Sequence, residues 1–346
     1  MKFALFSHIP WPEGTDQSRI LEELTEQVQC GEELGFYSAW LAEHHFTRYG
    51  LGSSSLVLAS NIAARTKTIR LGTGVLVPAL HHPIQLAEDT AMLDRVSGGR
   101  LDVGVGRGSG KYEFAGFGVD QNESQQRFRQ GIEIIEGLWT QPEFSYEGEY
   151  YKIYRVTVVP SPVQKPHPPV FVGATRTLAT LEFAGRSGHL IMVGAVPNIP
   201  DAIQQCRHFL THAASAGHDY SIGQIPFFRY FYVAETEEQA REDTRRAIEW
   251  QEDMIQWRST IAEGSDVTQH LDDFRQARTN LPTSFEEIYT NRAFFGTPDY
   301  CAAKIEALRR EGIDYFGCQF AFGGMEHAKI MRSMELFAKE VMPQFV

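Results

Sequence analysis

Short apolar segments alternate with amphipathic segments along most of this 346-residue chain. This alternation is typical of parallel strands joined by crossover helices, because each helix returns the chain to the same edge of the sheet. Eight segments have the length and composition of buried strands, at residues 3–7, 37–41, 69–75, 101–105, 170–172, 190–193, 226–233 and 315–320. Between them, apolar residues recur at helical spacing, for example over residues 20–34, 56–64, 84–96, 128–139 and 199–214. Eight strand–helix units predict a TIM (β/α)8 barrel, an α/β fold, over a single domain of residues 1–346.

Two segments interrupt the alternation. Residues 144–159 place the turn Glu147-Gly148-Glu149 between aromatic and β-branched residues, which predicts a β-hairpin after the fourth helix, and a Pro-rich connector continues it to residue 169. Residues 263–292 are polar and far longer than an ordinary connection. We expect this second insertion, after the seventh strand, to be either a mobile lid or a disordered excursion.

The composition restricts the partners and the compartment. A net charge of −12 and the lack of any Lys/Arg-rich run argue against a nucleic-acid surface. No apolar stretch reaches the length of a membrane span, and the first residues are too acidic for a signal peptide. The four cysteines are far apart with no C-x-x-C pair, which is typical of reduced thiols. We therefore expect a cytoplasmic protein without nucleic-acid or membrane partners.

The tetrapeptide Glu43-His44-His45-Phe46 comes directly after the predicted strand 37–41. Polar side chains at the end of a buried strand lie where the chain leaves the core and can meet a ligand. Neighbouring residues of an extended segment point to opposite sides, so His44 and His45 should have different surroundings and only one should be catalytic. The same geometry disfavours a metal site that uses both.

The predicted strand 101–105 ends in a glycine-rich segment. Gly104 and Gly106 are expected to face the barrel interior, where missing side chains leave room for a flat ligand; a bend or bulge is the alternative. Ser109 stands where a dinucleotide fingerprint needs its third glycine, so no Rossmann site is indicated. The guanidinium group of Arg107 can donate two parallel hydrogen bonds to a phosphate. The alternative to this ligand role is a surface salt bridge.

A second anion site is indicated after the predicted strand 170–172. The run Gly173-Ala174-Thr175-Arg176-Thr177 combines a Gly turn with a helix start, whose free N–H groups and hydroxyls attract anions, although ordinary helix capping explains the same pattern. His81 and His82 precede Pro83 and either line the same mouth or shape a loop. No H-x-H pair occurs, so the sequence does not predict a metallohydrolase or a bound metal.

Short motifs then follow one another in a distinctive order. They are Trp40-Leu41-Ala42-Glu43-His44-His45-Phe46-Thr47, Arg65-Thr66-Lys67-Thr68, Gly72-Thr73, His82-Pro83, Glu88-Asp89, Leu93-Asp94, Gly98-Gly99-Arg100, Gly106-Arg107-Gly108, Phe117-Gly118, Gly296-Thr297-Pro298, Met334-Glu335-Leu336-Phe337 and Val341-Met342-Pro343. This order resembles the bacterial luciferase-like, flavin-dependent monooxygenases over nearly the whole chain.

The resemblance implies a TIM-barrel monooxygenase that uses reduced FMN and O2 to oxidise a small organic substrate through a C4a-peroxyflavin. It places His44 at the reaction centre and Arg107 on the FMN phosphate. A separate NAD(P)H-dependent flavin reductase is expected to supply reduced FMN, because no nicotinamide fingerprint is present, and a homodimer is expected. The implied cofactor contacts are Ala42, Val75, Gly106, Arg107, Gly108, Tyr112, Gly173, Ala174, Thr175, Arg176, Val193 and Gly194.

The match has departures and leaves alternatives. Light-emitting subunits of the family carry a Cys at the position of Gly106 and a Glu-Ser pair at Thr175-Arg176, so light emission is not expected. The alternatives are an F420-dependent oxidoreductase of the same superfamily and a non-catalytic flavin-binding protein. The glutamyl tail of F420 needs an extended basic path, whereas the sequence offers only Arg107, Arg176 and Lys111 near the expected site.

Overall fold

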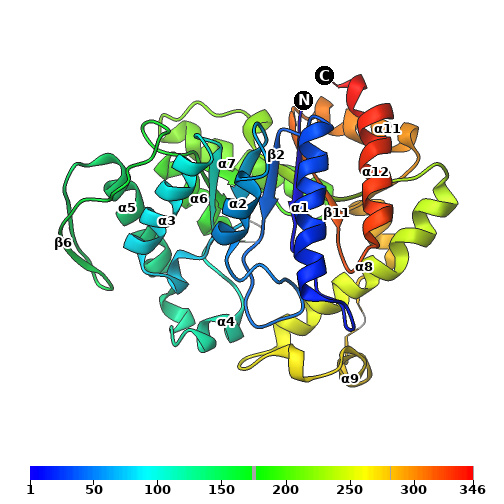
Figure 1. Ribbon diagram of the computed structural model, residues 1–346, viewed down its shortest axis with the longest axis horizontal. Helices are drawn as coiled ribbons and strands as arrows, with labels where there is room; N and C mark the ends of the chain where they lie inside the picture. The colour runs from blue at the N-terminus through cyan, green and yellow to red at the C-terminus, as the bar shows by residue number, and fades with distance from the viewer. Residues whose placement is uncertain (174–176, 281, 346) are drawn as a thin grey trace.

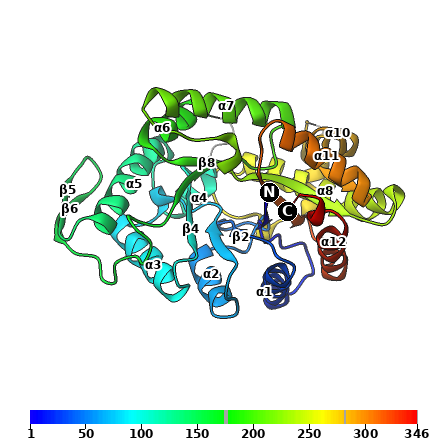
Figure 2. The same ribbon diagram turned by 90° about the horizontal axis from the view of Figure 1, so that it is seen from above.

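A curled parallel β-sheet forms the centre of the protein, as the computed structural model shows for residues 1–173, 177–280 and 282–345 (Figures 1 and 2). Within these residues the sheet has nine strands in the order β10-β9-β11-β1-β2-β3-β4-β7-β8. They are β1 Lys2–Ser7, β2 Ser38–Leu41, β3 Arg70–Thr73, β4 Leu101–Val105, β7 Val170–Gly173, β8 Leu190–Met192, β9 Phe227–Val233, β10 Phe294–Gly296 and β11 Tyr315–Ala321. Each of the eight predicted strands overlaps one of them, and the α/β class is confirmed. The short β10 was not predicted.

Hydrogen bonds also connect β8, the last strand of this order, with β9, the second strand. The Val193 N–H, just after β8, donates to the Pro226 carbonyl over 2.9 Å, and the Phe228 N–H of β9 donates to the Val193 carbonyl over 2.8 Å. The third neighbour of β9 is β10, which pairs with its far end from Phe231 onward. The curled sheet therefore encloses an interior, with the carboxyl ends of its parallel strands at one rim.

Helices surround the sheet in an outer layer (Figure 2). Several begin at a side-chain cap: the Asp16 carboxylate accepts from the Arg19 N–H over 2.9 Å, and the Ser54 hydroxyl accepts from the Val57 N–H over 3.3 Å. The helices are α1 Gln17–Glu33, α2 Ser55–Ala63, α3 Pro83–Val96, α4 Lys111–Gly116, α5 Ser124–Thr140, α6 Leu178–Ser187, α7 Ile199–Ser215, α8 Glu237–Thr260, α9 Leu271–Ala277, α10 Phe285–Asn291, α11 Pro298–Arg310 and α12 His327–Glu340. None of the helices in the described residues is long and apolar enough to cross a membrane.

Trp40 on β2 fills the enclosed interior. Its side chain is fully buried, and its ring packs edge-on against Phe171 of β7 and Phe228 of β9, with centroids 5.2 and 5.8 Å away. The indole N–H donates to the Ser38 hydroxyl over 2.9 Å, so this large ring is buried without leaving its donor unpaired. Gly72 on the neighbouring β3 makes room for it, because a Cβ there would lie 2.2 Å from the indole.

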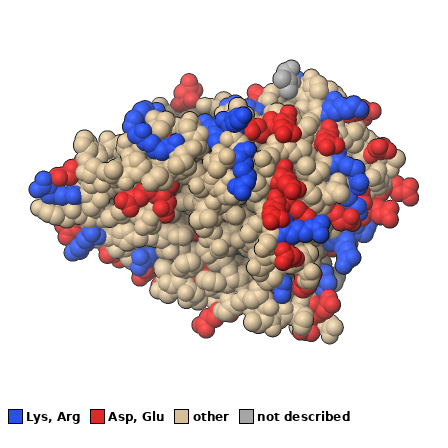
Figure 3. Space-filling model, viewed as in Figure 1, with Lys and Arg blue, Asp and Glu red and all other residues tan. Residues whose placement is uncertain are grey.

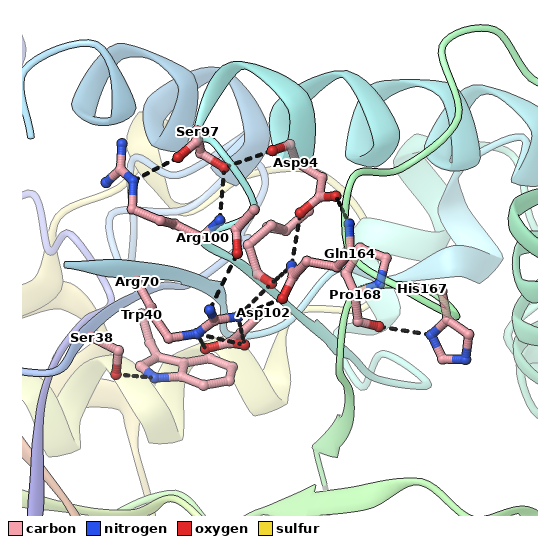
Figure 4. Close-up of polar contacts among 12 residues, drawn as sticks. Ser38, Trp40, Arg70, Asp94, Ser97, Arg100, Asp102, Gln164, His167 and Pro168 are labelled. Carbon is pink, nitrogen blue, oxygen red and sulfur yellow. Dashed lines mark hydrogen bonds and ion pairs between the residues drawn. The ribbon is translucent and has the colours of Figure 1, made fainter. Parts of the chain in front are cut away.

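A polar network fastens the amino ends of the strands to the connector that precedes β7 (Figure 4). Arg70 of β3 forms an ion pair with the buried Asp102 of β4, with Nη2 and Oδ1 2.6 Å apart. The Gln164 amide donates to Asp94 and to the Leu101 carbonyl, each over 2.7 Å. The connector therefore satisfies buried polar groups of α3 and β4 instead of crossing the surface freely.

A hairpin projects from one side of the molecule (Figure 1). Its strands β5 Phe144–Glu147 and β6 Lys152–Val156 pair antiparallel, where the sequence had placed a hairpin. Residues 263–292 contain η4 Asp266–Thr268, α9 and α10 in their described part, so this stretch has helical structure and does not form a structureless excursion. On the face shown in Figure 3, acidic and basic side chains are interspersed and form no continuous basic area.

The contact between Gly72 and Trp40 yields a stability prediction. Gly72→Ala should lower the free energy of unfolding by about 1–3 kcal/mol, because the added methyl group meets a rigid ring inside the closed sheet. Gly31→Ala in α1 is the matched control, since its Cβ would meet only the tip of the Leu5 side chain. Denaturant unfolding measures both, and Trp40→Phe should restore part of the loss in the Gly72→Ala background. Equal stability of the two glycine variants would contradict this packing.

Candidate active site

His44 lies beyond the carboxyl end of β2, and its ring contacts Tyr49 of the same loop and side chains from two other parts of the chain. Its Nδ1 is 3.5 Å from Oε1 of Glu113, which lies in the first turn of α4. Its ring stacks on that of His8, which follows β1, with centroids 5.7 Å apart, and meets the Tyr49 ring at 4.7 Å. Four side chains from three separate parts of the sequence thus meet at the rim where the strands end.

Burial lowers the pKa of His44 below its usual value, the charge of Arg258 lowers it further, and Glu113 opposes both effects. Burial by itself would raise the pKa of Glu113, but contacts with His44 and Arg258 and the N–H of His45 hold it below its usual value. At neutral pH this pair is therefore a neutral imidazole beside an ionised carboxylate. Such a histidine can accept a proton, and the adjacent carboxylate stabilises the cation that results.

Glu43 organises a second set of groups on the other side of the same segment. Its Oε1 is 3.1 Å from Nε2 of His45 and 2.8 Å from Nε2 of His81. Burial works to raise the pKa of Glu43, yet these two hydrogen bonds hold it below its usual value. His44 and His45 therefore bind different carboxylates, as their opposite directions predicted. His81 joins this set, whereas His82 caps α3 by accepting from the Ile84 N–H.

Arg258 brings a cation into the site from the outer layer. It belongs to α8, and its guanidinium lies 4.4 Å from the centroid of the Tyr49 ring. Its charge acts on His44, Glu113 and Tyr112. One cation placed beside buried carboxylates offsets part of the cost of removing them from water.

The space predicted beside Gly104 and Gly106 is filled by the neighbouring strand, so that expectation is wrong. A Cβ on Gly104 would lie 1.9 Å from the Thr73 carbonyl oxygen, and one on Gly106 would lie 2.5 Å from the Val75 side chain. A Cβ on Gly173 would also approach Val75, at 2.9 Å. Because these glycines have no side chains, the main chains of β4 and β7 approach Thr73 and Val75 closely.

Arg107 and Gly108 follow β4 at the same rim. In the described part of the chain, the half-buried Arg107 side chain forms no hydrogen bond or ion pair. Gly108 has a φ of 81°, a left-handed conformation that favours glycine. An unpaired guanidinium beside a glycine turn fits the phosphate of FMN, which needs charge and close access to the main chain. Ala174, Thr175 and Arg176, predicted to be on the same phosphate, lie outside the described residues.

Three other residues predicted to contact the cofactor pack against, or hydrogen-bond to, other parts of the protein. Ala42 is buried among the aromatic residues of the interior, and its N–H donates to the Ser7 carbonyl. Both main-chain groups of Val193 connect β8 with β9. The Gly194 carbonyl accepts from Nη1 of Arg229 over 2.6 Å, and burial lowers the pKa of that arginine to about 9, so it stays charged at neutral pH.

Tyr112 is fully buried, and its hydroxyl donates to Glu113 over 3.4 Å. Two further buried side chains, Gln319 and Tyr230, each keep a polar atom without a hydrogen-bond partner among the described residues. The Gln319 amide contacts Nδ1 of His8 at 2.9 Å, which places its free carbonyl oxygen near the histidines. Unpaired buried groups cost about 1–3 kcal/mol each, so the site is suited to a ligand that pairs with them.

His8, Glu113, Tyr49 and Arg258 lie in this candidate site but were not predicted from the sequence. His8 follows β1 directly, so the rule that selected His44 would have found it. Glu113 is a carboxylate just beyond the glycine-rich end of β4, which is a weaker signal. Arg258 is one of many charged residues in a 24-residue helix, and nothing local marks it.

A closed parallel sheet with a polar site at the carboxyl ends of its strands is the arrangement of barrel enzymes. Residues 1–315 match the family described as luciferase-like monooxygenases, and the chain belongs to this family of oxidoreductases. It is 31% identical over 244 residues to the oxygenase component of flavin-dependent trigonelline monooxygenase from Acinetobacter baylyi, covering 70% of this chain and 67% of that one.

Two solved structures define the fold relationship. The structure of monooxygenase RslO1 from Streptomyces bottropensis superimposes with a TM-score of 0.85 and 29% identity, covering 100% of both chains. An F420-dependent secondary alcohol dehydrogenase superimposes with a TM-score of 0.78 and 18% identity, covering 100% of this chain and 99% of that one. The second likeness shows the fold alone.

The segment 263–292 contacts the loop that carries the histidines. The Asp266 carboxylate accepts from the Arg48 N–H at 2.9 and 3.1 Å, and the Ser265 hydroxyl donates to the Phe46 carbonyl. Arg275 of α9 forms an ion pair with Asp253 of α8 over 2.7 Å. The segment is thus attached on one side to the loop after β2 and on the other to α8.

Burial raises the pKa of Asp266 to about 6, against the opposing effect of the Arg48 N–H. A carboxyl whose pKa is higher when docked takes up a proton on docking, so docking is favoured at low pH and weakens as the pH rises through about 6. From about pH 5 to pH 7 the docked population should fall about tenfold relative to the open one. Cleavage within 263–292 should accelerate accordingly, measured against an unfolded peptide to correct for the protease. Asp266→Asn should remove the pH dependence, and an unchanged slope in that variant would contradict this assignment.

Proposed function

We propose that the protein is the oxygenase component of a two-component FMN-dependent monooxygenase, which uses reduced FMN and O2 to oxidise a small organic substrate. The observation that carries the proposal is the half-buried His44, whose lowered pKa favours the neutral imidazole, with Nδ1 3.5 Å from the buried Glu113 carboxylate at the rim where the strands end. When bound, reduced flavin supplies the electrons that activate dioxygen. The protein then has to bind the cofactor, orient the substrate, move a proton and keep water away.

His44 is the group that moves the proton in this proposal. Its Nδ1 faces Glu113, so a proton held on Nδ1 leaves Nε2 as the acceptor. Proton transfer to Nε2 produces a cation whose charge Glu113 offsets at 3.5 Å. Tyr112 and the His45 N–H also donate to the Glu113 carboxylate, which fixes its orientation.

Arg107 and Gly108 would hold the cofactor phosphate, and Arg176 is proposed as a second cation there. The relative from Acinetobacter baylyi is named as flavin-dependent, which favours FMN for this chain. The F420-dependent dehydrogenase shares the fold, so F420 is the alternative cofactor to test. The glutamyl tail of F420 suits an extended basic path, and the net charge of −12 argues against such a path.

Residues 263–292 are proposed to act as a mobile lid over the site. Their attachment at Arg48 lies four residues beyond His44, so opening the segment exposes the loop that carries the histidines. A lid that closes over bound ligands excludes water from the reaction.

Partner proteins are also part of the proposal. The name of the Acinetobacter relative, an oxygenase component, supports a separate reductase that delivers reduced flavin. A homodimer through α2 and α3 is supported by exposed apolar side chains there: Val57 on α2 is 68% exposed, and Met92 and Val96 on α3 are 50% and 57% exposed. The free thiols of all four cysteines fit a reducing, cytoplasmic compartment.

Substitution of the two histidines tests the catalytic assignment. His44→Ala should leave FMN affinity within about threefold and lower product formation by about 10²–10⁴-fold, because only proton transfer is lost. His45→Ala should instead reduce stability or expression at least as much as turnover, because it removes a hydrogen bond to the buried Glu43. The assays follow reduced-FMN-dependent oxygen consumption and product. The reverse pattern would assign catalysis to His45, and full turnover in both variants would refute the mechanism.

Substitution of Arg107 tests the cofactor assignment. Arg107→Ala should weaken FMN binding by about 1.5–3 kcal/mol, or one to two decades, through loss of a charge-assisted phosphate contact. Riboflavin, which lacks the phosphate, is the matched control ligand and should bind almost unchanged. Equal losses for both ligands would show that Arg107 has a structural role. Wild-type binding of F420 with no measurable FMN affinity would favour the alternative function.

A further inference from the structure

Three potential metal ligands converge on the outer layer, between α6 and α7. His208 and His212 are four residues apart on α7 and so lie on one face of that helix, with ring centroids 4.7 Å apart. Glu182 of α6 faces both: its Oε1 is 3.6 Å from Nε2 of His208 and 3.8 Å from Nε2 of His212. We propose that these three side chains form a Zn²⁺ site, which clamps α6 against α7.

The distances fit a shared cation. Zinc takes imidazole nitrogen and carboxylate oxygen at about 2.0–2.2 Å, which places neighbouring ligand atoms of a tetrahedral site about 3.4 Å apart. The two separations between Glu182 and the histidines exceed this value by only a few tenths of an ångström, yet they are too long for direct hydrogen bonds, and all three ligand atoms lie within 4.8 Å of one another. Nε2 of His208 is shielded from solvent and has no hydrogen-bond partner among the described residues. A cation between the three groups would satisfy it.

The helix packing fixes this geometry. Gly185 follows Glu182 on the same face of α6, and a Cβ on it would lie 3.1 Å from the Cβ of His212 and 3.0 Å from the Phe209 carbonyl oxygen. The glycine therefore allows α6 and α7, which lie side by side in Figure 2, to approach closely beside the three ligands. Preorganised ligands on two rigid helices lower the cost of binding an ion.

The site is accessible and its carboxylate is available. The side chains of Glu182, His208 and His212 are 38%, 31% and 24% exposed, so an ion can enter and water can complete the coordination. In the described part of the chain, Glu182 has these two histidines as its only ionic partners. Imidazole with one carboxylate suits Zn²⁺ better than Mg²⁺ or Ca²⁺, which prefer oxygen ligands alone.

A second group, Glu43 with His45 and His81, has ligand atoms equally close together, but it is a poorer site. Its two His–Glu contacts are hydrogen bonds of 3.1 and 2.8 Å, so the carboxylate already has partners, and Glu43 and His45 are buried. Zinc would have to break both hydrogen bonds and reach the ligands through the protein. The proposal concerns the α6–α7 site alone and does not depend on the proposed oxygenase function.

The test uses untagged, full-length protein freed of metal by a chelator, with ZnCl₂ as the probe. Calorimetric titration should show one Zn²⁺ per chain, and saturating Zn²⁺ should raise the thermal unfolding temperature. His208→Ala, His212→Ala and Glu182→Gln should each weaken Zn²⁺ binding by at least about 10- to 100-fold. Removal of a residue that merely hydrogen-bonds a metal ligand already causes a loss of this size, and each of these variants removes a ligand itself. Circular dichroism verifies that these half-exposed positions tolerate substitution.

Two histidine variants act as matched controls. His218→Ala changes a histidine near the end of α7 that stacks on Tyr220, and His81→Ala removes a member of the Glu43 group; both should retain the Zn²⁺ affinity of the wild type. Absence of Zn²⁺ binding in the wild type would overturn the proposal. Unchanged binding in the three ligand variants, or loss of binding in His81→Ala alone, would overturn it as well.

Discussion

The packing of Trp40 inside the curled sheet determines where this protein can do chemistry. An indole on β2, flanked by Phe171 and Phe228 and accommodated by Gly72, occupies the space that the strands enclose. Ligands therefore have to bind above this layer, at the rim formed by the carboxyl ends of the strands. His8, His44 and Arg107 all follow strands at that rim, and the same closure brings β8 and β9 together on its far side.

Charge balance at the rim explains why one histidine suits catalysis. Glu43 and Glu113 are both buried and both held in the ionised form, which costs free energy unless nearby donors compensate. Glu43 is compensated by two histidines. Burial lowers the pKa of one of them, His81, but the hydrogen bond to Glu43 together with the charges of Glu43 and Asp89 raises it overall. Glu113 is compensated in part by Arg258, whose charge also disfavours protonation of His44. Burial, assisted by the cation from α8, thus lowers the pKa of His44 and leaves it able to accept a proton.

The sequence predicted what depends on local pattern. All eight expected strands exist because buried parallel strands appear as apolar runs, and His44 was identified because it directly follows one of them. Contacts between segments that are distant in sequence could not be predicted from local pattern. The partner role of Glu113, the arrival of Arg258 from a long polar helix and the three-residue β10 depend on how the elements pack. The glycines of β4 were recognised as unusual, but the Thr73 main chain and Val75 side chain fill the expected space.

Segment 263–292 connects the outer layer with the chemistry at the rim. It follows α8, the helix that supplies Arg258, and its Asp266 binds the main chain of the loop that begins with His44. If residues 263–292 act as the proposed lid, their opening would disturb the support of His44 from two directions, through α8 and through the loop. Since Asp266 binds its proton more tightly when docked, the segment and His44 respond oppositely to pH: acid favours docking, but acid also protonates the base. A reaction that needs both a closed site and a neutral His44 should then slow in acid because His44 is protonated, and slow as the pH rises because docking weakens.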